Sequence, residues 1–267
     1  MISEIVRNAL IDARFGYGFF ASHVNLLWRI AAVRIISTLL TTGLLDLTLI
    51  AIETHFLQVE FVGKYFGLMF FKLLIFVVSL STIAVAWHHG AAGLNPIRKS
   101  LIPNFSETSR TYALAVMMIS AVLMGSLMIV VFLTNTIAGG LSPMLGINMR
   151  VLSTILTFTA GTFTLGYACR YVPLIAATAH SGKQIMLAAR VSTAEAWSIL
   201  FMGSATLLPV VSGSRYLRLE LTELWATAAI PLTLISELGL ASGILVFLAA
   251  LSHRHAINIH NSAAIES

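Results

Sequence analysis

Apolar stretches long enough to cross a lipid bilayer recur along this chain of 267 residues. A transmembrane helix needs about 20 predominantly apolar residues to cross about 30 Å of hydrocarbon. About six stretches approach that length, and the fifth, which contains Pro209, is the shortest. They cover roughly residues 31–51, 66–87, 112–133, 151–171, 197–211 and 226–251. The pattern predicts an all-α fold, a polytopic transmembrane helix bundle of about six spans.

The scarcity of charge agrees with that prediction. Only 10% of the residues are charged and the mean hydropathy is +0.90, whereas soluble domains carry about 25% charged residues. Apolar side chains on such a surface can face lipid but not water. The formal net charge of +5 therefore indicates contact with the headgroups of membrane lipids, and nucleic acid is not an expected partner.

The basic residues also predict an orientation. Lys and Arg are enriched in cytoplasmic loops. Most of the 16 Lys and Arg residues fall in cytoplasmic segments if the N-terminus lies in the cytoplasm. We therefore expect a multi-pass membrane protein with both termini in the cytoplasm. A cleavable signal peptide is not expected, because charged residues interrupt the first 25 positions.

The N-terminal segment has a different pattern from the spans. Ile5, Ala9 and Ala13 recur at helical spacing, and charged residues such as Asp12 lie elsewhere around the helix. An amphipathic helix of this kind lies in the plane of the membrane surface. The expected parts are a cytoplasmic interfacial helix at 1–30, a six-span membrane bundle at 31–251 and a cytoplasmic tail at 252–267.

Three ionisable residues fall inside the expected spans, away from their cytoplasmic ends: Asp46, Lys72 and Glu237. Placing a charge in hydrocarbon is costly, so such residues are paired or functional. Asp46 and Lys72 are on adjacent antiparallel spans and could pair, which leaves Glu237 without a cation. One interpretation is a proton- or ion-responsive site. The other is a structural pair that fixes helix register, with Glu237 protonated or bonded to hydroxyl groups.

Other motifs are weaker. Gly239 and Gly243 form a Gly-x-x-x-Gly pattern, which permits close helix packing within the bundle or in a dimer. His88, His253 and His255 are weak candidates for metal ligands, because the ends of two spans could bring them together without a rigid tetrahedral set. No metal or other cofactor is expected. The catalytic sequence motifs of hydrolases, metalloproteases and nucleotide-binding enzymes are absent from the sequence.

Three short segments carry a family resemblance. The second apolar stretch ends in Ala84-Val85-Ala86-Trp87-His88 and the third opens with Tyr112. The fourth runs into Tyr167-Ala168-Cys169-Arg170-Tyr171-Val172-Pro173-Leu174, and the fifth opens with Ala194-Glu195-Ala196-Trp197. These segments resemble uncharacterised six-span bacterial inner-membrane proteins that are loosely similar to the membrane domain of some glycerophosphodiester phosphodiesterases. His89, Ser198 and Ile199 depart from the basic residues usual in that pattern.

The resemblance implies a six-helix membrane bundle without an agreed activity. It does not imply phosphodiesterase activity, because the catalytic part of those enzymes is a separate soluble barrel. We therefore expect an accessory or structural subunit that binds membrane lipids, another membrane protein or a second copy of itself. The alternative is a small proton- or ion-linked transporter or channel that uses Asp46, Lys72 and Glu237. An enzyme acting on lipids is the least favoured class.

Overall fold

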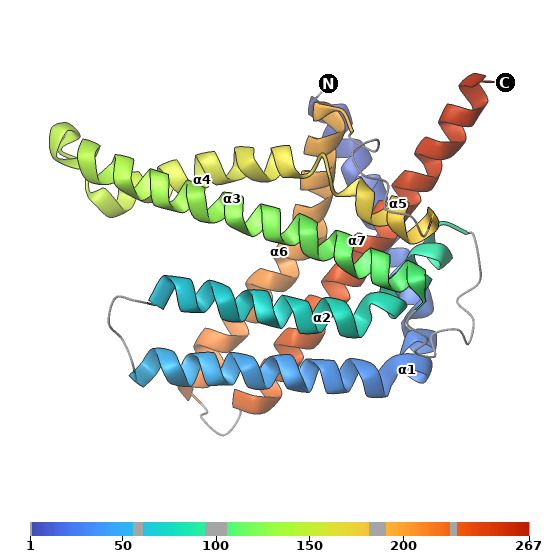
Figure 1. The fold of residues 1–267 in the computed structure, drawn as a ribbon, viewed down its shortest axis with the longest axis horizontal. Helices are drawn as coiled ribbons and strands as arrows, with labels where there is room; N and C mark the ends of the chain where they lie inside the picture. Colours follow the sequence, from blue (N-terminus) through green and yellow to red (C-terminus); the bar gives the residue numbers. More distant parts are fainter. Residues whose placement is uncertain (1, 56–60, 94–105, 182–190, 225–228, 267) are drawn as a thin grey trace.

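The computed structural model describes residues 2–55, 61–93, 106–181, 191–224 and 229–266, and within them every element is an α-helix. This confirms the predicted all-α class. The helices are α1 (Ile2–His55), α2 (Phe61–Ala91), α3 (Glu107–Leu145), α4 (Met149–Ala168), α5 (Pro173–Ser181), α6 (Thr193–Leu224) and α7 (Ala229–Glu266). Figure 1 shows their arrangement.

Three helical stretches in the described part of the chain have the length and apolar composition of a membrane span. They are Glu107–Leu145, Met149–Ser181 and Ile235–Ile257, and they contain most of the third, fourth and sixth expected spans. The other expected spans fall within α1, α2 and α6. Of these helices, α1 also contains a shorter apolar segment, Ile35–Leu45. Six membrane passes therefore remain a prediction.

The expected interfacial helix is continuous with the first expected span. α1 runs unbroken from Ile2 to His55, and Figure 1 shows it changing direction between a first part beside α6 and α7 and a last part beside α2. The first part buries Ala9, Asp12 and Ala13 against the bundle. Its place at a membrane surface remains a prediction. The expected tail likewise belongs to α7, which continues to Glu266.

The core lies where α1, α2, α6 and α7 meet. α7 packs extensively on both α1 and α6. Trp87, Ile199, Met202 and Leu251 are almost completely buried there, and the Trp87 indole N–H donates to the Leu245 carbonyl at 2.8 Å. Burial of these large apolar side chains is the main favourable term that holds the four helices together.

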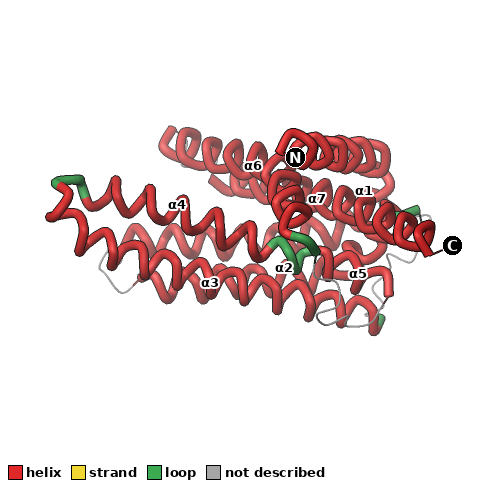
Figure 2. The backbone as a smooth tube through the Cα atoms, turned by 90° about the horizontal axis from the view of Figure 1, so that it is seen from above, coloured by secondary structure: helices red, strands yellow, loops and turns green. Residues whose placement is uncertain are grey.

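α3 and α4 form a helical hairpin that extends from the bundle (Figures 1 and 2). Gly146 ends α3 in the left-handed conformation, with φ of 64°, which glycine adopts without steric cost. Asn148 then caps α4 by accepting the Arg150 backbone N–H at 2.9 Å. The short α5 follows α4 and packs on α2, α3 and α7.

Candidate functional site

One turn of α7, Ser252-His253-Arg254-His255, joins it to the other bundle helices. Ser252 is hydrogen-bonded to His88 of α2, and the His253 ring stacks on Phe15 of α1 with centroids 3.8 Å apart. Arg254 binds residues of α1 and α6, whereas the ring of His255 lies 5.2 Å from that of His180 in α5. We call these four residues the α7 hub. They position the ends of four helices relative to α7.

Arg254 is the centre of a charged network in the hub. Its guanidinium lies 3.2 Å from the Asp12 carboxylate, 3.7 Å from that of Glu195 and 2.7 Å from the Ser198 hydroxyl, to which it donates. The Ser198 hydroxyl in turn donates to the Ile5 carbonyl at 3.2 Å. These contacts fasten the N-terminal part of α1 to both α6 and α7.

The Asp12 carboxyl group is buried beside its ionic partner, Arg254. Burial raises its pKa to about 6, against the opposing effect of Arg254 and with a further increase from Glu195. Desolvation disfavours the charged form of a carboxyl group, whereas a neighbouring cation favours it. Asp12 in the hub thus keeps its proton to a higher pH than a carboxyl group in water does.

A directional chain of hydrogen bonds links α3, α2 and α7. The Ser252 hydroxyl donates to the Leu248 carbonyl at 3.0 Å, so its oxygen accepts from the Nδ1–H of His88. That tautomer leaves Nε2 of His88 to accept from the Tyr112 hydroxyl at 3.2 Å. His88 and Tyr112 are buried, so each bond satisfies a polar group that water does not reach.

Four histidines from three helices lie near this chain. The His180 ring is 6.3, 5.9 and 5.2 Å from the rings of His88, His89 and His255. Nε2 of His89 donates to the Ala179 carbonyl at 2.7 Å, whereas Nε2 of His180 is buried and bonds to no described residue. Across the described ranges, no group of three or more His, Cys, Asp or Glu residues is arranged to hold a metal ion.

The predicted histidine trio is separated. His88 and His255 both approach His180, which the sequence reasoning missed, whereas His253 faces Phe15 on α1. His180 occupies a short, mostly buried helix of small residues, where neither spacing nor a motif indicates a site. It is recognised only once the fold brings α5 onto α2 and α7.

Of the three ionisable residues in the expected spans, the structure describes the side chain of one, Glu237. Glu237 is 2% exposed, and its Oε2 lies 3.3 Å from the Thr42 hydroxyl of α1. The side chains of Asp46 and Lys72 lie outside the described part of the structure. Gly239 and Gly243 both face Val210 of α6, where a β-carbon would lie 3.4 and 3.3 Å from its methyl groups. The glycine pair thus packs α7 against α6 within this chain.

The α3–α4 hairpin combines polar hydrogen bonds between its two helices with large apolar side chains on its outside. Thr134 and Thr157 share a hydrogen bond of 2.7 Å between the two helices, and Ser153 is bonded to Asn135. Large apolar side chains point outward, among them Phe132, at 70% exposed, and Phe158, at 76%. We call this outer surface the hairpin face; it comprises Val122, Ile129, Phe132, Met144, Phe158 and Phe163. A surface of this kind requires lipid or another protein against it.

Comparisons of the chain with protein-family models, with curated proteins and with solved structures found no match. What the fold itself defines is an α-helical protein with three helices of membrane-spanning length and composition in its described part.

Proposed function

We propose that this chain is a multi-pass protein of the bacterial inner membrane that acts as an accessory subunit, binding other membrane components rather than catalysing a reaction. The observation that carries this proposal is the hairpin face. Across its most apolar window, α3 has no buried residue, although α4 packs along it. A membrane helix that its own chain leaves uncovered on this scale offers a broad surface to a second membrane protein.

The hub supports a structural role for the rest of the molecule. Arg254 of α7 bonds both Asp12 of α1 and Ser198 of α6, and His88 is bonded on both ring nitrogens. Polar groups used in this way fix the geometry of the bundle, which then presents the hairpin from a rigid base. Packing of apolar side chains and hydrogen bonds between helices are the forces that associate membrane helices.

Site-specific photocrosslinking in native membranes tests the partner. A photoreactive amino acid replaces Phe158 or Phe132 on the hairpin face, and the matched control replaces Leu208, an equally apolar α6 residue that is 57% exposed. The expected result is one discrete protein adduct from the hairpin positions and none from Leu208. An adduct with a second copy of this chain would make the partner a homo-oligomer. Lipid adducts alone at all three positions would overturn the proposal.

Topology needs its own test. Both termini are proposed to be cytoplasmic, which requires an even number of passes. Fusions of a fluorescent protein, active only in the cytoplasm, and of alkaline phosphatase, active only in the periplasm, can be made after Ser267. A fluorescent C-terminal fusion with inactive phosphatase is expected, and the reverse pattern would contradict a cytoplasmic C-terminus.

A proton-linked transporter or channel is the second candidate, because Glu237 is a buried carboxyl group within an apolar helical stretch, Ile235–Ile257. Buried carboxyl groups in membrane helices serve proton relays in pumps and transporters. The contact with Thr42 also fits a purely structural role. Proton flux through the wild type and Glu237→Gln separates these two interpretations.

A further inference from the structure

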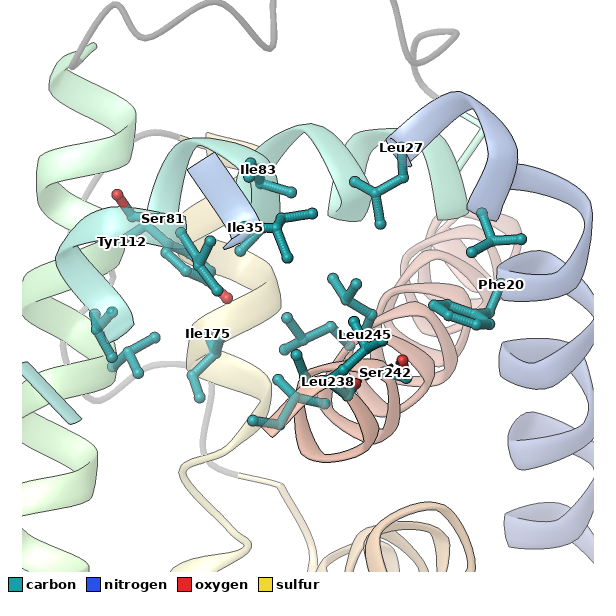
Figure 3. A pocket seen from close by; sticks show the side chains of 18 of the residues that line it. Phe20, Leu27, Ile35, Ser81, Ile83, Tyr112, Ile175, Leu238, Ser242 and Leu245 are labelled. Atoms are coloured by element: carbon teal, nitrogen blue, oxygen red, sulfur yellow. Dashed lines mark hydrogen bonds between the residues drawn. The ribbon is translucent and has the colours of Figure 1, made fainter. Parts of the chain in front are cut away.

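A cavity of about 200 Å³ lies among α1, α2, α3, α5 and α7 (Figure 3). Ile35, Ile83, Ile175, Leu238 and Leu245 represent the aliphatic side chains that line it. It lies within the bundle, away from the hairpin face. The proposed accessory role therefore does not account for it, and it requires an occupant of its own.

The hydroxyl groups in the cavity wall are already bonded to the protein. The Ser81 hydroxyl donates to the Val78 carbonyl at 3.3 Å, and the Ser242 hydroxyl donates to the Leu238 carbonyl at 2.8 Å. The Tyr112 hydroxyl is bonded to His88. A polar ligand would lose its hydrogen bonds to water without gaining equivalent ones here. The lining of the cavity therefore favours a hydrocarbon as its ligand.

The size of the cavity suits a flexible chain segment. An engineered apolar cavity of about 150 Å³ stays free of water and binds benzene, and this cavity is larger. Atoms that line an empty cavity lose dispersion contacts on one side, and a hydrocarbon guest restores them. A chain with many rotatable bonds can follow a wall built from five helices.

The helices around the cavity identify the source of that hydrocarbon. Three helical stretches of membrane-spanning length and composition contribute to the cavity wall. Leu238 and Leu245 belong to one of them, Tyr112 to the second and Ile175 to the third. Trp28 lines the cavity and is also 47% exposed, so it lies where the cavity meets the outside of the protein. Tryptophan is enriched where a membrane meets water. The abundant hydrocarbon at that depth is the acyl chain of a phospholipid.

We propose that this cavity is a specific binding site for one acyl chain of a membrane phospholipid, which enters beside Trp28. The bound chain completes the packing among α1, α2 and α7, and its headgroup remains outside near Trp28. This lipid would be retained when the surrounding membrane is removed. The proposal does not depend on the accessory function, because a protein with any activity could hold such a lipid.

Native mass spectrometry combined with lipid photocrosslinking tests the site. The protein is purified in detergent, and a phosphatidylethanolamine with a diazirine near the end of one acyl chain serves as the probe. Ala84→Leu and Ala241→Leu each fill the cavity from its wall, and Ser242→Leu provides a third variant if either fails to fold. Ala121→Leu adds the same side chain to an exposed position on α3 and is the matched control.

The wild type and Ala121→Leu are expected to retain one phospholipid per chain and to crosslink within residues 77–84 or 238–248. The folded cavity-filling variants should lose most of that lipid and that crosslink. Crosslinks confined to outer surfaces would overturn the proposal, as would unchanged retention in folded Ala84→Leu, Ala241→Leu or Ser242→Leu. Retention of a polyprenyl or quinone molecule instead of a phospholipid would overturn the assigned ligand.

Discussion

Gly16 of α1 lies so close to Val246 of α7 that a β-carbon on Gly16 would be 2.4 Å from the Val246 carbonyl oxygen. That distance is far inside van der Waals contact, and the obstacle is backbone, which cannot rotate away. The closest approach of the two helices therefore depends on the missing side chain. Asp12 and Arg254 bond at 3.2 Å on the same pair of helices.

Gly16→Ala should destabilise the protein by about 1–3 kcal/mol, the usual cost of overpacking a core. Gly18→Ala is the control, because nothing lies within 4 Å of a β-carbon there. Alanine favours a helix over glycine by about 1 kcal/mol, so that variant should be unchanged or more stable. Thermal unfolding in detergent measures both. Equal stability of the two variants would refute the close approach of α1 and α7.

Arg254→Met should cost about 3 kcal/mol, because it leaves the buried Asp12 carboxylate without its cation. Arg110→Met, at an exposed position near the start of α3, should have little effect. Adding Asp12→Asn to Arg254→Met should restore part of the loss, because the unpaired charge is removed. Chemical or thermal unfolding of the wild type, Arg254→Met, Asp12→Asn and the double variant gives the comparison. Purely additive losses would show that the two side chains do not interact.

Asp12 should make stability depend on pH in a defined direction. Its pKa rises from 3.8 to about 6 on folding, so the folded protein binds this proton more tightly than the unfolded chain. The contribution of Asp12 is therefore most favourable below pH 4, declines as the pH rises to about 6, and is constant above that. Burial is the largest cause of the raised pKa; the charge of Arg254 opposes it and that of Glu195 adds to it.

Unfolding temperatures of the wild type and Asp12→Asn between pH 4 and pH 8 isolate that contribution. The stability of Asp12→Asn relative to the wild type should increase across pH 4–6 and then stay level. Subtracting the two curves removes the effects of histidines that both proteins share. A relative stability that stayed level over the same interval would mean that folding does not raise the pKa of Asp12.

Glu237→Gln should leave folding nearly unchanged, because an amide oxygen can still accept the Thr42 hydroxyl. Glu237→Leu should be less stable, because it removes that acceptor from a buried site. Under the accessory function, neither variant changes proton flux in vesicles loaded with a pH-sensitive dye. A wild-type flux that Glu237→Gln abolishes would instead establish the proton-linked function.

The helical class was predictable because each apolar stretch is long and lacks strand or turn signals. The continuity of α1 was not, since polar residues around position 30 mark the edge of a hydrophobic stretch without ending a helix. Asp12 shows a second limit. Its place on an amphipathic helix suggested exposure, whereas the structure buries it beneath Arg254, a residue far away in the sequence. His180 joins His88 for the same reason: tertiary packing decides which polar residues meet.

The α7 hub has a consequence for biogenesis. Because α7 is made after α1 to α6, Asp12 and Gly16 leave the ribosome long before the residues that cover them. During that interval the Asp12 carboxyl group and the backbone at Gly16 are not yet covered by α7. The packing of α1 on α7 therefore forms only after α7 has been made, and until then this part of α1 is accessible.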